Sequence, residues 1–211
     1  MPIISMLGTG TVARALAERF LLADCTVRFG ARDVKAAETK LSGVLATAAT
    51  LSPAEASANA DMIVLAVPAG AAVVAARSAG DPTGRILLDC TNPLRWDAGP
   101  VWAPPPEGST SLALAAEFPT ARVVKGFNHF GAEIQHNPAL TTGSADAFFA
   151  GDDAEAKTFV MSLAGRMGFR AHDAGPLRNS ALLENLAVLW IHLASVGGAG
   201  RDFAFQMERQ H

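Results

Sequence analysis

Short apolar runs alternate along the chain with segments in which apolar residues recur at helical spacing. The apolar runs predict strands at residues 3–7, 25–29, 61–67, 85–90, 121–127, 145–150 and 169–172, with a weaker candidate at 44–46. Helical spacing predicts helices at 10–23, 33–41, 69–79, 111–118, 153–167 and 179–196, and Ser52 with Pro53 is typical of one more helix start. Strands that alternate with helices predict right-handed crossovers, and therefore an α/β fold with a doubly wound, mostly parallel sheet.

Two segments depart from this alternation. Residues 92–108 contain five prolines and predict a long irregular loop, which in a compact domain is usually functional or mobile. Residues 177–211 follow the last predicted strand, and we expect them to form a C-terminal helical extension of a domain at 1–176. Leucines at helical spacing within 179–196 indicate either burial against the domain's own sheet or a homodimer interface, and the sequence leaves both open.

Composition and charge exclude several classes of protein. The 211 residues are 50% hydrophobic, have a net charge of −3 and contain no basic cluster, so we expect no nucleic-acid partner. The longest apolar helix, at 181–196, is shorter than a bilayer span and includes Glu184, Asn185 and His192, so we expect no membrane segment. The first residues lack the basic region of a signal peptide, which favours a cytoplasmic protein.

The first predicted strand is followed by a glycine-rich turn that opens a predicted helix. The turn reads Gly8-Thr9-Gly10-Thr11-Val12-Ala13. Gly8 permits a tight turn, Gly10 allows a pyrophosphate to approach the backbone, and a small residue at Ala13 allows close packing of helix on strand. The N–H groups at the start of the helix would bind the phosphates. The position of this turn therefore predicts a Rossmann domain that binds a dinucleotide.

The end of the second predicted strand indicates which dinucleotide is bound. An NAD-binding protein usually has a carboxylate here, which accepts hydrogen bonds from the ribose hydroxyls. This chain has Ala31 and Arg32 at that point, followed by Asp33 and Lys35. Arginine stacks on adenine and pairs with a 2′-phosphate, and lysine adds positive charge. We therefore expect NADP rather than NAD, with Asp33 as a helix N-cap.

The remaining candidates stand at the carboxyl ends of later strands, where a doubly wound sheet binds its ligands. They are Ala66, Val67 and Pro68 after one strand, Asn92 after the next, and Asn128 with His129 after the third. Asn92 would orient the nicotinamide or the substrate through its amide, although Asn-Pro is also an ordinary turn start. His129 would handle a proton or cap the following helix. No catalytic residue is assigned, and His129 and Asn128 are the candidates.

The sequence contains none of the common hydrolase, metalloprotease or nucleotide-phosphate motifs, and no spacing typical of metal ligands. Its two cysteines, Cys25 and Cys90, lie in apolar, strand-like runs. We expect both to be buried thiols, without a disulfide or a metal.

The chain resembles the NADPH-dependent F420 reductase family, the coenzyme F420-dependent NADP oxidoreductases. The similar stretches are GTGTVARAL, GARD, DMIVLAVP, LLDCTNPL, VVKGFNHFGAE, FFAGDDAEAK, GFRAHDAGPL and ALLENLAVL. The domain is also similar to the cytosolic part of membrane ferric reductases, which pass hydride from NADPH to a flavin. The resemblance implies a pyrophosphate site at residues 8–12 and a 2′-phosphate site at Arg32. Family members often have serine where Ala31 stands.

The resemblance implies hydride transfer between NADPH and a second flat cofactor, either a deazaflavin (coenzyme F420) or a flavin (FMN or FAD). Such a reaction needs stacked rings more than an acid or a base, in agreement with a chain that has a cofactor turn but no catalytic dyad. One alternative is an NADP-dependent dehydrogenase or reductase of a small carbonyl or imine metabolite. Enzymes of that kind generally add a helical substrate domain. Another alternative is a non-catalytic NADP-binding sensor.

Overall fold

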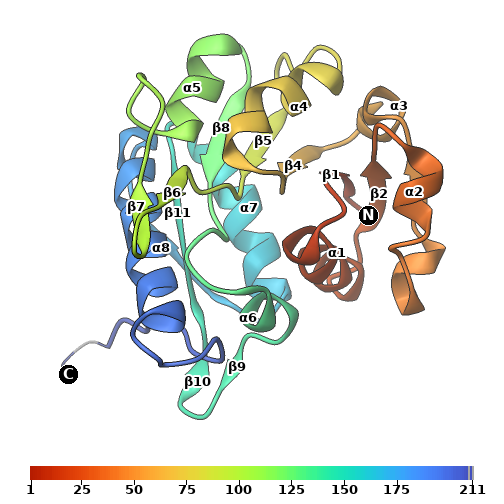
Figure 1. The fold of residues 1–211 in the computed structure, drawn as a ribbon. Coiled ribbons are helices and arrows are strands. Elements are labelled where there is room, and N and C mark those ends of the chain that lie inside the picture. The colour runs from red at the N-terminus through yellow and green to blue at the C-terminus, as the bar shows by residue number, and fades with distance from the viewer. Residues whose placement is uncertain (209, 211) are drawn as a thin grey trace.

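A computed structural model describes residues 1–208 and 210, and its centre is one eight-stranded sheet with helices on both faces (Figure 1). The strands of this sheet are β1 (Ile3–Leu7), β2 (Thr26–Gly30), β3 (Ala49–Leu51), β4 (Met62–Leu65), β5 (Ile86–Asp89), β8 (Arg122–Lys125), β11 (Asp146–Gly151) and β12 (Arg170–Asp173). The α-helices are α1 (Thr11–Leu22), α2 (Val34–Glu38), α3 (Pro53–Ser57), α4 (Ala72–Ser78), α5 (Thr110–Glu117), α6 (Ala132–His136), α7 (Ala154–Arg166) and α8 (Ser180–Ser195).

The strand order is that of a doubly wound dinucleotide-binding sheet. It runs β12-β11-β8-β5-β4-β1-β2-β3, and the six strands from β8 to β3 are parallel. The order therefore reverses direction beside β1, between β1 and β4, which is where such sheets bind nucleotides. β11 pairs antiparallel with β8, and β12 pairs parallel with β11. The mostly parallel α/β fold expected from the sequence is confirmed.

The central strands are buried on both faces, which explains their continuous apolar sequences. In β4, Met62 and Val64 belong to a cluster that includes α1 and α7 side chains, whereas Ile63 and Leu65 belong to a second cluster on the opposite face. The second cluster is closed by α4 and α5, through residues such as Ala76 and Leu114. Local signals start the helices as expected, since Ser52 and Glu55 form a capping box at α3.

The structure corrects three details of the expected pattern. Residues 44–46 form part of a 3₁₀ helix, η1 (Gly43–Thr47), rather than a strand, because Gly43 turns the chain at a φ of +59° and the amide of Leu45 donates to the carbonyl of Ser42 at 3.2 Å. The strand follows at β3. The segment 92–108 is not wholly irregular, since β6 (Leu94–Trp96) and β7 (Pro100–Trp102) form an antiparallel hairpin. A second hairpin, β9 (Ala139–Leu140) with β10 (Gly143–Ser144), was not expected. Helix α6 follows His129 as expected, but it begins after Gly131 without a side-chain cap, so His129 does not cap it.

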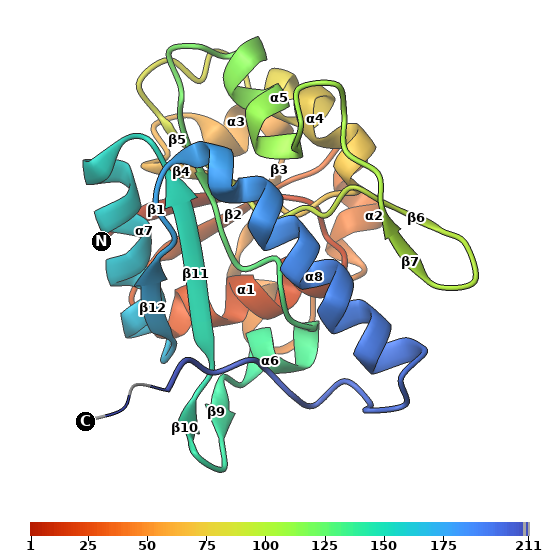
Figure 2. The same ribbon diagram turned by 90° about the vertical axis from the view of Figure 1, so that its left-hand side faces the viewer.

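Helix α8 lies against its own domain, alongside the β6–β7 hairpin and β11 (Figure 2). It buries Leu183, Glu184, Ala187 and Trp190, whereas Leu182 and Leu189 are exposed. The chain then turns back, and the Trp190 indole donates to the carbonyl of Phe203 at 2.8 Å. Part of the leucine row is therefore buried within this chain, and part faces solvent.

The expectation that both cysteines are buried agrees with the structure. Cys25 and Cys90 are both buried and free. No helix within residues 1–208 is long and apolar enough to cross a membrane.

Candidate functional site

The turn between β1 and α1 has the geometry that its two glycines predict. Gly8 has a φ of +118°, and a Cβ there would lie 2.3 Å from the carbonyl oxygen of Ala66 on the adjoining β4 loop. Gly10 has an ordinary φ of −73°, and a Cβ on it would meet no atom within 4 Å. Gly8 is therefore required by the packing of the turn, whereas Gly10 faces open space that a ligand can approach.

The N-terminus of α1 has no capping side chain. Asp33, Ser52, Ser109 and Asp153 cap other helices of the fold, but α1 begins after Gly10 and has no side-chain cap and no acidic residue in its first turn. The first helical bond runs from the amide of Arg14 to the carbonyl of Gly10. The amides that precede Arg14 in the helix point out of its end without helical acceptors, which suits a bound phosphate.

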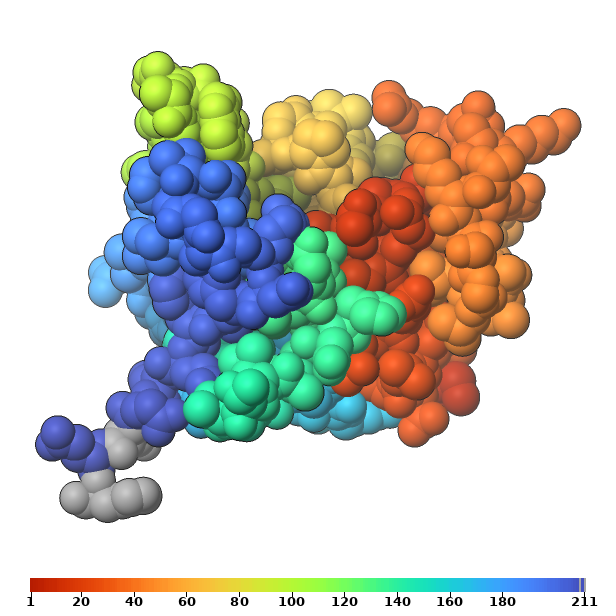
Figure 3. Space-filling model, turned by 60° about the horizontal axis from the view of Figure 1, so that its bottom comes forward, coloured from red at the N-terminus to blue at the C-terminus, as the bar shows by residue number. Residues whose placement is uncertain are grey.

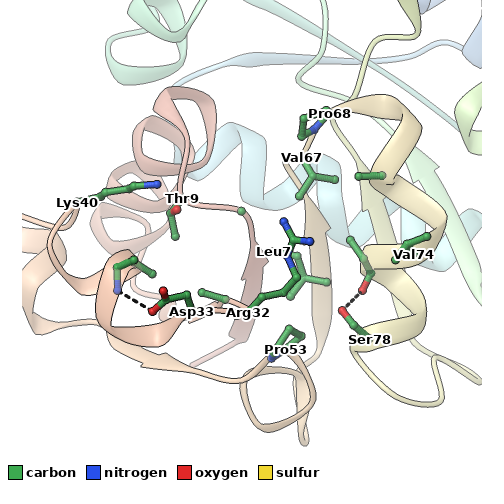
Figure 4. Close-up of a pocket in the computed structure, with 17 residues that line it drawn as sticks. Leu7, Thr9, Arg32, Asp33, Lys40, Pro53, Val67, Pro68, Val74 and Ser78 are labelled. Carbon is green, nitrogen blue, oxygen red and sulfur yellow. Dashed lines mark hydrogen bonds between the residues drawn. The ribbon is translucent and has the colours of Figure 1, made fainter.

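A cavity of about 570 Å³ opens beside this turn, between α2 and α4 (Figure 4). Its lining includes six of the residues that the sequence assigns to cofactor binding: Gly8, Thr9, Ala31, Arg32, Val67 and Pro68. The lining includes the cations Arg32 and Lys40 and apolar groups such as Val74, and the guanidinium of Arg32 lies in the middle of the cavity, apart from Lys40. The carboxylate of Asp33 accepts from the amide of Ala36 at 3.0 Å, so it caps α2 as expected. A cavity lined by two cations and several apolar groups suits a phosphorylated adenosine.

Other residues named for the cofactor lie outside the lining of this cavity. Gly10, Thr11 and Val12 lie at the start of α1, and Ala66 packs against Gly8. Lys35 is exposed on α2 and does not line the cavity, whereas Lys40, just beyond the helix, does. Sequence spacing did not identify Lys40, which lies in a turn just after α2, where its amide donates to the carbonyl of Ala37 at 2.9 Å.

A second cavity, of about 640 Å³, lies between α4, α5 and the β6–β7 hairpin and shares Pro68 with the first. The molecular surface dips on both sides of the segment that contains α4 (Figure 3). The second cavity has no charged residue in its lining, which consists of Pro68, Ala69, Gly70, Val73, Asn92, Pro93, Leu94, Ala103, Pro104, Pro105, Thr110 and Ala113. Its prolines and small apolar groups suit a flat, uncharged ring.

Asn92 and Asn128 are brought together at the carboxyl ends of β5 and β8. The Asn92 amide donates to the carbonyl of Asn128 at 2.7 Å, and the Asn128 amide donates to Oδ1 of Asn92 at 2.8 Å. Asn128 also donates to the carbonyl of Leu183 on α8, at 2.9 Å. The pair fixes two loops and helix α8 relative to one another. Asn92 is half-buried and lines the second cavity, whereas Asn128 is buried.

His129 lies in the interior rather than on a cavity wall. Its side chain packs between Phe130 and Phe148, with ring centroids 4.6 and 5.3 Å away, and its Nε2 lies 3.2 Å from the carbonyl oxygen of Asp146. Burial lowers the pKa of His129 to about 4, despite the nearby Asp146. The imidazole is therefore neutral at neutral pH and lines none of the cavities described above.

A buried ionic cluster beneath the edge of the sheet was not expected from the sequence. Lys125 of β8 lies 2.9 Å from Asp89 of β5 and 3.1 Å from Glu184 of α8, and all three side chains are fully buried. The Asp89 carboxylate also accepts from the Ser111 hydroxyl at 2.7 Å. Lys125 and Asp89 lie in predicted strands and Glu184 lies in a predicted helix, so only the three-dimensional fold shows that the three side chains meet. Within residues 1–208, no group of His, Cys, Asp or Glu side chains could hold a metal ion.

The sheet order and the first turn define a Rossmann-type domain, and comparison with known proteins shows it to be that of an NADP-dependent oxidoreductase. The sequence model of the family described as "NADP oxidoreductase coenzyme F420-dependent" matches residues 3–93. The F420-dependent NADP reductase of Methanothermobacter thermautotrophicus is 30% identical over 205 residues, which cover 88% of this chain and 86% of that protein. The chain therefore belongs to the F420-dependent NADP reductase family.

Other relatives extend the comparison. Metalloreductase STEAP3 of Rattus norvegicus is 30% identical over 87% of this chain, and the chain spans 36% of its length. The crystal structure of a candidate F420-dependent NADP-reductase from Arthrobacter sp. FB24 has a TM-score of 0.88 at 29% identity, over 98% of this chain and 99% of that one. A reductive aminase from Aspergillus terreus in complex with NADPH has a TM-score of 0.67 at 21% identity, over 94% of this chain and 63% of that one. The likeness to the reductive aminase shows the fold alone.

Proposed function

We propose that this protein transfers hydride between NADPH and a deazaflavin or flavin, with coenzyme F420 as the first acceptor to test. The observation that supports it is the pair of cavities that share Pro68. One has Arg32 and Lys40 and adjoins the uncapped start of α1, and the other is apolar and without charge. A charged dinucleotide and a flat ring would therefore be bound side by side at the same edge of the sheet.

The residues of the chain would bind and orient NADP. The helix-start amides at residues 11–13 would hold the pyrophosphate, and Arg32 with Lys40 would hold the 2′-phosphate. Val67, Pro68 and Val74 would supply apolar contact to the adenosine half. Ala31 supplies no hydroxyl, so the 2′-phosphate would depend on the two cations. When bound, a reduced nicotinamide supplies a hydride, which requires the two rings to lie about 3–3.5 Å apart.

No side chain of the second cavity is placed to act as an acid or a base. Its polar groups are Asn92 and Thr110, and the histidine nearest in sequence, His129, is buried elsewhere with a lowered pKa. The reaction therefore depends on the chain for position and for the exclusion of water. The prolines at 93, 104 and 105 form rigid walls for that purpose.

The test is stopped-flow oxidation of NADPH by the purified protein, with coenzyme F420, FMN and FAD offered separately and NADH as the comparison donor. Rapid, saturable oxidation with one acceptor supports the proposal and names that acceptor. Tight NADPH binding without oxidation by any of the three would overturn it, and small carbonyl or imine substrates, or a sensor role, would then be tested.

A cytoplasmic homodimer is the assembly that we propose for this enzyme. Exposed Leu182, Leu189 and Val196 form an apolar surface on and just after α8, and the two free thiols suit a reducing compartment. In this assembly, residues 177–211 would extend the domain at 1–176 and contact the partner copy. Sedimentation of the Leu182→Glu/Leu189→Glu variant tests the assembly: a wild-type dimer that becomes monomeric supports it, and a wild-type monomer overturns it.

A further inference from the structure

Buried Glu184 contacts both ends of one loop of the second cavity. The loop spans residues 103–109 and connects β7 to α5. Oε2 of Glu184 accepts from the indole N–H of Trp102 at 3.0 Å, and Oε1 accepts from the amide of Thr110 at 3.0 Å. Trp102 is the last residue before the loop, and Thr110 is the first residue after it. One carboxylate on α8 therefore fixes both ends of the loop.

A second contact ties the same loop to the same helix. The Ser109 and Ser180 hydroxyls lie 2.7 Å apart, and both side chains are fully buried. Ser180 and Glu184 are four residues apart, so they lie on one face of α8. Figure 3 shows α8 and the β6–β7 hairpin side by side on the surface. Helix α8 thus makes two hydrogen bonds at the C-terminal end of the loop and one at the N-terminal end of the loop.

This loop forms part of the second cavity. Ala103, Pro104, Pro105 and Thr110 all line it. A loop with three consecutive prolines has little freedom between its ends, so the positions of the ends determine where its wall lies. A change in the contacts of Glu184 would therefore move the wall of the second cavity, while the first cavity, which has no residue from this loop or from α8, would keep its shape.

The contacts require a carboxylate at position 184. Glu184 accepts from Trp102, from Thr110 and from the Lys125 ammonium, and it is fully buried. A glutamine has the same shape but only one accepting oxygen, since its NH₂ group donates. Glutamine would therefore lose at least one of these contacts and place an N–H group against a donor.

We infer that Glu184 is a positioning residue for the acceptor: it holds both ends of loop 103–109 and so sets the shape of the second cavity. The predicted effect on turnover rests on the proposed function, because the proposed function identifies the second cavity as the acceptor site. The predicted effect of Glu184 on the loop does not rest on the proposed function. Two measurements therefore separate the two claims.

The first measurement is steady-state kinetics of Glu184→Gln, with NADPH and the acceptor varied separately. The KM for the acceptor is expected to rise by about tenfold, the size of one lost hydrogen bond to a charged group, while the KM for NADPH stays within about twofold. Trp102→Phe removes one donor without disturbing Lys125, and it should raise the acceptor KM in the same direction. In the Trp102→Phe background, Glu184→Gln should have a smaller effect than it has alone. Asn185→Ala, an exposed neighbour on α8, is the matched control.

The second measurement is hydrogen–deuterium exchange of the amides at residue 103 and residues 107–112, which does not require turnover. Faster exchange confined to this segment in Glu184→Gln and Trp102→Phe supports the inference. Unchanged exchange overturns it, as does an equal rise in the KM for NADPH and for the acceptor. If the wild-type protein oxidises NADPH with none of the acceptors, the proposed function fails, and the exchange result alone then decides whether Glu184 positions the loop.

Discussion

The ammonium nitrogen of Lys125 lies 2.9 Å from Oδ2 of Asp89, and neither side chain is exposed. The two residues are register partners at the ends of the neighbouring parallel strands β8 and β5. The same ammonium donates to the carbonyl of Thr91 at 2.6 Å and to Glu184 at 3.1 Å. Two strands, the loop after β5 and helix α8 therefore meet at one buried cation, directly beneath the edge where both cavities open.

Replacement of this cation should destabilise the fold severely. Lys125→Met leaves Asp89 and Glu184 as buried carboxylates without their shared cation, which typically costs about 3–5 kcal/mol. The free energy of unfolding, measured by urea denaturation, is expected to fall by that amount. Arg77→Ala is the control, because Arg77 pairs with Glu117 on the surface, with 60% and 38% of the side chains exposed. That pair should contribute less than about 1 kcal/mol, and equal losses in the two variants would contradict the prediction.

The two glycines of the first turn should separate stability from cofactor binding. A Cβ on Gly8 would collide with the Ala66 carbonyl at a φ of +118°, so Gly8→Ala should lower the free energy of unfolding by about 1–3 kcal/mol. A Cβ on Gly10 meets no protein atom, so Gly10→Ala should stay within about 1 kcal/mol of wild type. Its methyl group would nevertheless occupy the space of the pyrophosphate, and the Kd for NADPH should rise more than about tenfold.

Urea denaturation and fluorescence titration with NADPH measure the two effects of these glycine variants. The prediction fails if Gly10→Ala binds NADPH as tightly as wild type. It also fails if Gly10→Ala is as unstable as Gly8→Ala, because the first turn would then be packed more tightly around Gly10 than the structure shows.

Most of the fold follows from local sequence signals. The strands β4 and β5 are continuous apolar runs because both faces are buried, and Asp33, Ser52 and Asp153 cap helices through their own side chains. The first turn was predictable because its glycines, the strand before it and the helix after it are adjacent in the sequence. The hairpin β6–β7 was not, because its strands are only three residues long, β6 is fully exposed, and neither strand has an apolar alternation.

The parts of the site that sequence reasoning missed are set by contacts between distant residues. Lys125 and Asp89 are 36 positions apart, and Glu184 is a further 59 positions along. Each would be assigned to a solvent-exposed position by its charge alone. Lys40 lines the first cavity from the turn after α2, together with residues at the ends of β1 and β4 that are distant in the sequence. Pairings of this kind depend on tertiary structure and leave no signal in local periodicity.

The preference for NADPH over NADH should depend on Arg32 more than on any lysine. Arg32→Ala removes the cation of the cavity that can form two parallel hydrogen bonds, so the ratio of kcat/KM for NADPH to that for NADH should fall by about tenfold or more. Lys40→Ala should lower the ratio by up to about fivefold, as expected for one exposed point charge that forms no bidentate pair. Lys35→Ala is the matched control, because Lys35 is exposed and does not line the cavity. A larger effect of Lys35 than of Lys40 would show that the 2′-phosphate lies elsewhere.

His129 should make the stability of the protein depend on pH between about 6.5 and 4. Its pKa falls to about 4 in the folded state because of burial, whereas an unfolded histidine titrates near about 6.5. Between these values the unfolded chain binds a proton that the folded chain does not, so stability is fully present above about pH 6.5 and decreases as the pH falls. The free energy of unfolding should fall by about 3 kcal/mol in total as the pH is lowered. Most of this fall occurs before the pH is low enough to protonate Asp146, whose pKa is lowered below its usual value.

His129→Phe should remove this part of the pH dependence, because the ring position is already surrounded by Phe130 and Phe148. The measurement is the free energy of unfolding in urea at pH 7, 6 and 5. His192→Gln replaces an exposed histidine and should keep the wild-type slope. If His129→Phe also keeps that slope, the imidazole of His129 takes up its proton without unfolding of the chain. A solvent path to His129 would then exist, and the residue would again be a candidate for proton transfer.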